Sequence, residues 1–338
     1  MAKTFEIVLG ANYGDEGKGL ITDMICHKYS DKKVLNVLFN GGPQRGHTVE
    51  LKDGTRHVFH HLGAGTFAGA RTYFDKDFLI EPSIFCTETN ELAYDQCVYV
   101  NENCRVITII DVMLNRYMES KIKKVGSCGL GVWETMRRYE VIKKVTSEEY
   151  APNIKELFSM TQAEIKHYFA YIANIYVRRE LKNRGLSVQQ QIEALEFIKS
   201  YNTYEYAEGF YVWIRKMKLQ CVLIDNDRPL FDRFDVIVFE GAQGLLLDHD
   251  NESEKPHVTS SNTTSKIPVE RIEEYIKNTD KLTVNYVSRR YLTRHGTGPL
   301  KYECSREEVG AEADITNVFN ANQGEFRYAP LNEIEMKK

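Results

Sequence analysis

Short apolar runs alternate with amphipathic stretches along most of the chain. Runs rich in Val, Ile, Leu and Phe are typical of strands buried on both faces of a parallel sheet. The run at 5–9 leads into a glycine-rich loop, and apolar side chains then recur at helical spacing over 20–25. This order predicts an α/β fold that opens with a strand, a loop and a helix. Further strands are expected at 34–39, 106–110, 236–239 and 282–287.

Strands separated by helical stretches favour a largely parallel central sheet flanked by helices. Because the chain shows no internal repeat and no low-complexity linker, we expect residues 1–338 to form a single domain. The stretch from about 147 to 218 has a helical pattern throughout. We interpret it as a helical insertion whose apolar stripe packs into the core rather than binding a ligand. Two capping boxes mark helix starts within it, Thr161 with Glu164 and Ser187 with Gln190.

Composition and charge narrow the class of protein. A net charge of -4 and a pI near 6.2 give no basic footprint, so we expect small ligands and no direct binding of nucleic acid or membranes. Seven cysteines without a CxxC pair argue against a disulfide framework and a zinc site, and for a reducing compartment. The sequence shows neither a signal peptide nor an apolar stretch of about 18 residues. These features predict a cytoplasmic protein.

The first loop, GANYGDEGKGL at 10–20, is a candidate phosphate site, because ligands of doubly wound sheets collect at the carboxyl ends of strands. It is not a Walker A motif, which would need glycine in place of Asn12 and a hydroxyl in place of Gly19. Its glycines still let backbone N–H groups approach an anion, and Lys18 can pair with a phosphate oxygen. The alternative is a plain strand-to-helix turn.

A second polar loop, at 40–48, carries His47 in a glycine-rich context after a strand, where a titratable imidazole is useful in catalysis. A structural histidine is the alternative. Three nearby histidines lack a carboxylate or cysteine at matching spacing, so we do not expect a metal cluster of His57, His60 and His61.

Three more polar segments complete a candidate ligand site. The segment 239–244 contains Gln243, whose amide can both donate to and accept from a heterocycle. The run of hydroxyls at 258–264 can bind phosphate, cap a helix or form an ordinary polar loop, and 293–299 combines glycines with cations. Glycine, amide, hydroxyl and cationic groups at the ends of at least four strands point to a large polar ligand.

The motifs, taken in order, resemble those of adenylosuccinate synthetases. They are GDEGKG at 14–19, GG followed by GHT at 41–48, FEGAQG with LLD at 239–248, VTSSNTT at 258–264 and TRxGxGP at 293–299. The resemblance implies a fold related to P-loop NTPases. It also implies an enzyme that phosphorylates the 6-oxygen of a purine nucleotide and then displaces the phosphoryl group with the amine of aspartate.

The resemblance also implies roles for individual residues. Asp15 would remove the N1 proton of the purine and bind Mg²⁺ together with the backbone carbonyl of Gly46. His47 would hydrogen-bond the 6-oxygen and the transferred phosphoryl group. The groups implied to hold the donor phosphates are Gly14, Asp15, Glu16, Gly17, Lys18, Gly19, Gly46, His47 and Thr48.

The acceptor nucleotide would be bound by a second implied set, namely Asp15, Gln44, Ser127, Cys128, Arg137, Gln243 and Thr259. Ser127 and Cys128 stand where the family has two threonines that hold the 5′-phosphate, and a thiol donates only weakly. The family is homodimeric, with an arginine reaching into the partner's site. Arg137 and Arg138 both lie in the corresponding region.

Two departures from ordinary members suggest different substrates. Gln44 replaces an asparagine and Arg45 adds a cation in the loop at 41–48, which indicates a changed acceptor. The arginine-rich loop that binds aspartate in the family is replaced by the segment 314–328. A carboxylate ligand still needs a cation, so we assign aspartate binding to Thr316, Asn322, Gln323 and Arg327. A surface loop is the alternative for this segment.

No guanine-reading TKxD segment follows residue 327, so we expect ATP or dATP as donor. This combination resembles the phage branch of the family, which joins aspartate to dGMP for 2-aminoadenine DNA. Some members of that branch replace the loop aspartate, whereas Asp15 is retained here. The alternatives are an adenylosuccinate synthetase that uses IMP and GTP, and a regulatory nucleotide-binding protein. A protein of the latter kind has no need of both Asp15 and His47.

Overall fold

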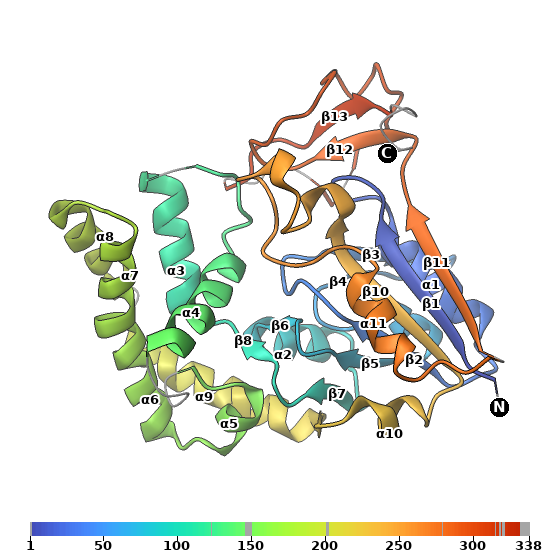
Figure 1. The fold of residues 1–338 in the computed structure, drawn as a ribbon, viewed down its shortest axis with the longest axis horizontal. Helices are drawn as coiled ribbons and strands as arrows, with labels where there is room; N and C mark the ends of the chain where they lie inside the picture. The colour runs from blue at the N-terminus through green and yellow to red at the C-terminus, as the bar shows by residue number, and fades with distance from the viewer. Residues whose placement is uncertain are drawn as a thin grey trace.

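The computed structural model describes residues 2–122, 124–145, 151–200, 203–278, 280–314, 316–317, 319 and 322–331. A central sheet of seven parallel strands forms its core (Figure 1). Its strands are β1 (Thr4–Gly10), β2 (Val34–Leu38), β5 (Arg71–Phe74), β7 (Val98–Asn101), β9 (Cys221–Ile224), β10 (Val236–Gly244) and β11 (Lys281–Val287). They lie in the order β11-β1-β10-β2-β5-β7-β9, and every neighbouring pair is parallel. The prediction of a largely parallel α/β sheet is confirmed.

Alternating side chains of β1 show how the strands are buried on both faces. Phe5 and Ile7 belong to one apolar cluster, which includes Phe231 of α10 (Asp227–Phe231) and Ile272 of α11 (Lys266–Glu273). Val8 points to the other side and packs in a cluster with Cys26 of α1 (Lys18–Lys28). Helices therefore cover both faces of the sheet, as the continuous apolar runs indicated.

Four expected strands are confirmed as β1, β2, β10 and β11, but the strand expected at 106–110 is wrong. Only Arg105–Val106 (β8) pairs as a strand there, and α3 (Ile109–Tyr117) begins after two further residues. Thr108 caps this helix: its backbone N–H donates to Asp111 Oδ2 at 2.8 Å, and its hydroxyl oxygen accepts from the Asp111 N–H at 3.4 Å. A capping box thus overrides the β-branched run.

A helical region lies beside the β7 and β9 edge of the sheet, drawn from cyan through green to yellow in Figure 1. The capping boxes predicted at Thr161 and Ser187 are present. Residues 147–150 and 201–202 of the expected insertion lie outside the described residues, and the single-domain organisation stays a prediction. The helices here are α2 (Pro82–Glu91), α3, α4 (Val132–Val145), α5 (Ile154–Ser159), α6 (Gln162–Tyr171), α7 (Val177–Asn183), α8 (Val188–Ser200) and α9 (Thr203–Gln220), with π-helical turns at Met118–Ile122 and Ile172–Tyr176.

Smaller elements surround the ends of the main strands. Two antiparallel pairs join β3 (His47–Glu50) to β4 (Arg56–Phe59), and β12 (Tyr291–Arg294) to β13 (Arg327–Pro330). A short parallel pair joins β6 (Leu79–Ile80) to β8. Single 3₁₀ turns occupy Ala64–Ala68, Leu245–Leu247 and Glu252–Glu254. Among the described helices, none has the length and apolarity that a membrane crossing requires.

A buried ion pair fixes α4 against α3. The Arg138 guanidinium donates to both carboxylate oxygens of Asp111, each at 2.8 Å, and also to Val106 O at 2.8 Å. Both side chains are almost fully buried. Because Asp111 also caps α3, one carboxylate holds the start of one helix and the middle of another.

Replacing Arg138 with methionine leaves the Asp111 charge buried without its partner. We expect Arg138→Met to lower the free energy of unfolding by about 3–5 kcal/mol, measured by urea denaturation. The neighbouring Arg137 is the matched control, because its side chain is 40% exposed and its partner Glu180 keeps a second ion pair with Arg184. Arg137→Met should cost about 1 kcal/mol or less. Equal losses in the two variants would contradict this account of the Arg138 pair.

Candidate active site

A cavity of about 1230 Å³ lies at the carboxyl ends of the central strands. Its walls come from the loops that follow β1, β2, β10 and β12, from the segment 125–133 and from the segment 310–323. The predicted loops therefore meet at one site, as the parallel topology requires. The predicted residues that line it together are Gly14, Asp15, Glu16, Gly17, Lys18, Gly19, Gln44, Gly46, His47, Thr48, Ser127, Cys128, Gln243, Thr259, Thr316, Asn322 and Gln323.

The loop between β1 and α1 has a backbone that few sequences can adopt. Gly14 and Gly17 have φ angles of 94° and 93°, and Asp15, which has a Cβ, has a φ of 56°. A left-handed conformation at a residue other than glycine is often found at functional sites. Gly19 is needed for another reason, because a Cβ there would lie 2.8 Å from the Cβ of His47. The first turn of α1 can approach β3 only at a glycine.

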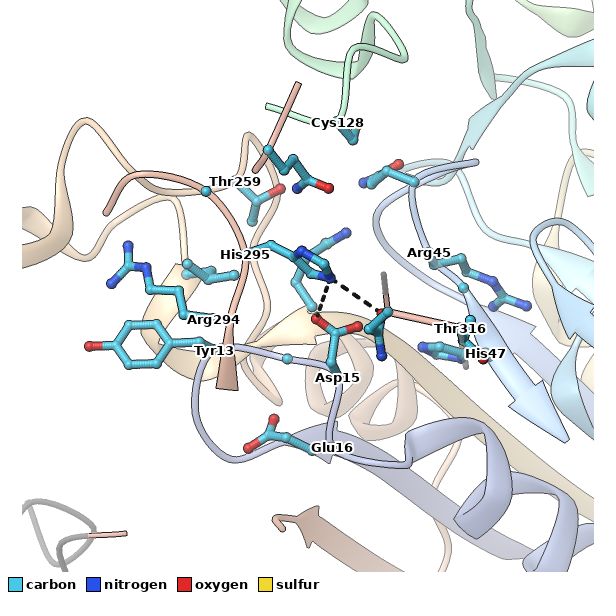
Figure 2. A pocket seen from close by; sticks show the side chains of 18 of the residues that line it. Tyr13, Asp15, Glu16, Arg45, His47, Cys128, Thr259, Arg294, His295 and Thr316 are labelled. Carbon is cyan, nitrogen blue, oxygen red and sulfur yellow. Dashed lines mark hydrogen bonds and ion pairs between the residues drawn. The ribbon is translucent and has the colours of Figure 1, made fainter. Parts of the chain in front are cut away.

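The two adjacent carboxylates of this loop have different environments. Glu16 is buried, and its Oε1 accepts from the backbone N–H and the side-chain amide of Asn12 at 2.8 and 2.7 Å. Burial raises the pKa of Glu16 to about 7, against the lowering effect of Lys18 and Asn12. The side chain of Asp15 is 29% exposed and points to the other side of the loop (Figure 2). Glu16 thus stabilises the turn, whereas Asp15 faces the cavity.

Lys18 supplies a cation below this loop. It is buried, and burial lowers its pKa, while the carboxylates of Glu16, Asp15 and Glu240 act in the opposite direction. A buried ammonium among carboxylates at the start of a helix, together with N–H groups of a glycine loop, forms an arrangement suited to a polyphosphate.

His47 forms a buried pair with Glu240, a residue of β10. Its Nδ1 lies 2.5 Å from Glu240 Oε1, and Glu240 Oε2 accepts from the Ala64 N–H at 3.0 Å. Arg45 Nη1 lies 3.6 Å from the same carboxylate. Burial would raise the pKa of Glu240, but the Arg45 charge and the His47 hydrogen bond lower it to about 2.

Burial also lowers the pKa of His47, to about 4, although its bond to Glu240 opposes the shift. The ring is therefore neutral near pH 7. Since Glu240 is ionised, Nδ1 carries the hydrogen and donates it, which leaves Nε2 as an acceptor. Glu240 was missed in the sequence, although its place at the end of a buried strand and before a glycine was a usable signal.

The residues expected at the acceptor nucleotide differ in how they are held. Within the described residues, both amide atoms of Gln44 and Oε1 of Gln243 are buried without hydrogen-bond partners. Ser127 Oγ accepts from the side-chain amide of Asn115 at 3.0 Å. Burial raises the pKa of the Cys128 thiol to about 11, so the thiol stays protonated.

Arg137 does not line the cavity of its own chain. Its Nε donates to Glu180 Oε1 at 3.0 Å on the helical side of the structure. Arg138 is fully buried against Asp111, so of the two arginines only Arg137 has an exposed side chain. A role in a partner's site, and the homodimer itself, stay predictions.

The residues assigned to aspartate fall into two groups. Thr316, Asn322 and Gln323 line the cavity, whereas Arg327 does not. The Arg327 guanidinium pairs with Glu303 and donates to the carbonyls of Gly296 and Gly298 at 2.9 and 2.6 Å. Four cations that sequence reasoning missed line the cavity, namely Arg56, Arg116, Arg289 and Arg290, and Arg294 of the predicted segment 293–299 lines it as well. The aspartate assignment stays a prediction.

The described side chains fit a Mg²⁺ ion that is held by one carboxylate together with substrate phosphates, rather than by a cluster of protein ligands. Across the described residues, no group of three or more His, Cys, Asp or Glu side chains is arranged to hold a metal ion. His57 and His61 instead contact Glu88, His57 through its ring and His61 through its backbone. Mg²⁺ commonly uses one or two carboxylates together with substrate phosphates and water. The partly exposed Asp15 carboxylate beside the phosphate loop fits that pattern.

A glycine-rich loop with a buried lysine, a buried imidazole–carboxylate pair and two amides meet around one cavity, an arrangement typical of enzymes that act on nucleotides. The family model described as adenylosuccinate synthetase matches residues 7–327. The chain belongs to this family, whose members are ligases that form a C–N bond at the expense of a nucleoside triphosphate and depend on Mg²⁺.

Relatives of known name support the family. The adenylosuccinate synthetase of Flavobacterium psychrophilum is 28% identical over 342 residues, which cover 96% of this chain and 72% of that protein. The Streptomyces griseus enzyme is 27% identical over 326 residues, covering 92% and 69%.

Two solved structures share the fold. Adenylosuccinate synthetase from Plasmodium falciparum aligns with a TM-score of 0.66 at 21% identity, over 96% of this chain and 71% of that one. Succinoaminodeoxyadenylate synthetase (PurZ) of cyanophage S-2L, bound to dGMP and to dATP as an energy donor, aligns with a TM-score of 0.67 at 16% identity, over 99% and 80%.

The lowered pKa of His47 makes stability depend on pH. The unfolded chain takes up this proton near pH 6.5 and the folded chain only near pH 4, so stability is lost as the pH falls through this window. Between pH 7.5 and 5, we expect the free energy of unfolding of His47→Gln to fall by about 2 kcal/mol less than that of the native protein, measured by urea denaturation. Glu16 titrates in both proteins and cancels in the difference. His167→Gln, at an exposed site, should follow the native curve, and a parallel curve for His47→Gln would refute the prediction.

Proposed function

We propose that this enzyme joins L-aspartate to C6 of dGMP with ATP or dATP as phosphoryl donor. The product is N6-succino-2-amino-2′-deoxyadenylate, the precursor of 2-aminoadenine in phage DNA. The observation that carries the proposal is the altered loop after β2, where Gln44 stands beside the cavity. An ideal Cβ on Gly41 would lie 3.4 Å from Gln44 Nε2 and 3.5 Å from Gln243 Oε1, so the two amides flank the same glycine.

Paired amides suit the edge of guanine. The base presents an acceptor at O6 and adjacent donors at N1 and the 2-amino group, whereas hypoxanthine lacks the 2-amino donor. Neither amide oxygen has a hydrogen-bond partner in the described residues, so each can accept one after the side chain turns toward a ligand. A site that bonds the 2-amino group discriminates against a base without it, because its own acceptor would then stay buried and unpaired.

The fold neighbour from cyanophage S-2L gives the proposal independent support, since it was solved with dGMP and dATP. One observation favours a second candidate, an adenylosuccinate synthetase that uses IMP and GTP: the relatives of known name are enzymes of that kind.

The arrangement of side chains supports a two-step reaction. The Asp15 carboxylate accepts the N1 proton, and the resulting O6 oxyanion attacks the γ-phosphorus, which releases the nucleoside diphosphate. The aspartate amine then attacks C6, and the 6-oxygen leaves with the phosphoryl group as inorganic phosphate. Lys18 and the loop N–H groups hold the donor phosphates through both steps.

His47 and the metal compensate charge during these steps. His47 faces the phosphoryl group as it moves between oxygens, and Glu240 and Arg45 fix its ring. A polyphosphate close to the ring favours the imidazolium, which can donate from Nε2. Mg²⁺ held by Asp15 and the Gly46 carbonyl would neutralise phosphate charge. Thr316, Asn322 and Gln323 form the part of the cavity wall assigned to the amino acid.

The choice of substrate can be measured directly. We expect the purified protein with aspartate and Mg²⁺ to turn over best with dGMP and ATP or dATP, among pairings of dGMP, GMP or IMP with ATP, dATP or GTP. Gln44→Asn should lower the ratio of kcat/KM for dGMP over IMP by about tenfold or more, because the amide is withdrawn by one methylene. Best turnover with IMP and GTP would favour the second candidate. Absence of turnover with every pair would indicate a nucleotide-binding protein without activity.

The role of Asp15 can be tested by removing its basicity while keeping its size. Asp15→Asn should lower kcat by about two to four orders of magnitude, since an amide cannot accept the N1 proton. A rate within a few-fold of the native enzyme would show that another group is the base. Glu16→Gln is the matched control. Because the Glu16 carboxylate accepts from the Asn12 backbone N–H, this variant should lower the free energy of unfolding more than it lowers kcat.

A further inference from the structure

We propose that His295 is a positioning residue for Asp15, and that it is held in place by Asn317. The inference rests on the proposed role of Asp15 as the base. His295 follows β12 and lines the cavity, with its side chain 18% exposed. Its Nε2 lies 3.7 Å from Asp15 Oδ2 and 3.3 Å from Asn317 Oδ1 (Figure 2, dashed lines). Since both neighbours are oxygens, Nε2 carries a hydrogen. Asn317 Oδ1 lies within hydrogen-bond distance of it, and Asp15 Oδ2 lies at ion-pair distance on the same edge of the ring.

Two contacts fix the ring of His295 in this place. Thr293 donates from its hydroxyl to the Gly14 carbonyl at 3.3 Å, which sets β12 beside the phosphate loop. The imidazole packs on Phe326, with ring centroids 4.7 Å apart and planes at 39°. The ring therefore cannot turn freely, and its Nε2 remains directed at the two oxygens.

Arg289, which precedes β12, holds the backbone of Asp15 as well. Arg289 Nε donates to the Asp15 carbonyl at 2.5 Å, and Arg289 Nη2 donates to Asp314 Oδ2 at 2.9 Å. Asp314 in turn accepts from the Asn317 backbone and side chain, each at 3.0 Å. The turn at Asp314 and Asn317 thus fixes Asp15 at both ends, its carbonyl through Arg289 and its carboxylate through His295.

This arrangement explains how a residue in a left-handed conformation can act as a base. A short carboxylate on a tight turn can rotate about χ1, and only some rotamers face the nucleotide. A donor on Oδ2 selects one rotamer and leaves Oδ1 for the N1 proton. The 3.7 Å separation is long for a hydrogen bond, and contacts of catalytic groups commonly tighten to hydrogen-bond distance when substrate binds. Misplacement of a reacting group by about 1 Å can cost about 100-fold in rate.

The experiment compares His295→Phe, which keeps the ring packing on Phe326, with His295→Gln, which restores an N–H donor. With the best substrate pair of the native enzyme, we expect His295→Phe to lower kcat by about 10- to 100-fold with nucleotide KM values within about threefold. His295→Gln should recover a substantial part of the rate. His167→Phe, at an exposed histidine of α6, is the control and should match the native enzyme. A rise in KM with kcat unchanged, or no recovery in His295→Gln, would overturn the proposal.

A second measurement separates the two chemical steps. In ATP labelled with ¹⁸O at the β,γ-bridge, reversible transfer to the 6-oxygen without aspartate scrambles the label, and this step alone needs the base. His295→Phe should slow scrambling as much as turnover. Unchanged scrambling with slow turnover would place His295 at the amine step and refute the positioning role. If the native enzyme prefers IMP, the proposal that dGMP is the substrate fails. The same comparison of variants, made with IMP, still tests the role of His295.

A variant of Asn317 provides a separate test of the contact between Asn317 and His295. If Asn317 acts through the imidazole, Asn317→Ala should slow scrambling more in the native background than in His295→Phe, where only its bond to Asp314 remains to be lost. Effects that multiply fully in the double variant would show that Asn317 does not hold His295.

Discussion

The buried carboxylate of Glu240 is the constraint on which the site depends. It is buried inside the sheet, where an unpaired charge would be very costly. Arg45, His47 and the backbone N–H of Ala64 surround the carboxylate and compensate its charge. These partners come from the loop after β2, from β3 and from the 3₁₀ turn Ala64–Ala68. One charge therefore draws three separate segments to the middle of β10. Arg45 fits this role better than that of a nucleotide ligand, since its guanidinium points at Glu240 and not into open space.

The neighbouring acids of the phosphate loop show a division of tasks that burial makes possible. Glu16 is withdrawn from solvent and holds the turn, while Asp15 keeps access to the cavity. The backbone strain at Asp15 is tolerated because contacts on both sides of the residue hold it. The polyphosphate proposed to bind at these N–H groups and Lys18 would then leave the Asp15 carboxylate free to act on the purine.

Much of the fold followed from the sequence, because it depends on local patterns. The strands β1, β2, β10 and β11 are long apolar runs, and the helix starts at Thr161 and Ser187 have their own capping boxes. The short strands β5, β7 and β9 were missed, since four residues carry too little periodicity to stand out. The error at 106–110 arose because β-branched residues were weighed above the cap at Thr108.

The candidate site divides in the same way. Loops that follow strands could be predicted to meet, since parallel topology brings them to one edge, and most of the predicted residues share one cavity. The partners that hold them could not be found, because Glu240 and His47 are 193 residues apart and Asp15 and Arg289 are 274 apart. For Arg327 the composition of the tail suggested a free cation, whereas a long-range ion pair with Glu303 occupies it.

Asp111 has a consequence beyond the stability of one helix. The same carboxylate caps α3 and neutralises Arg138, and α3 carries Asn115 and Arg116 to the cavity wall. This part of the wall therefore cannot unfold separately from α4. Unwinding α3 from its first turn would remove Asp111 from Arg138 and leave the Arg138 charge unpaired. On heating, this cavity wall and the helical region should be lost in one cooperative step, so that activity would persist until the fold itself fails.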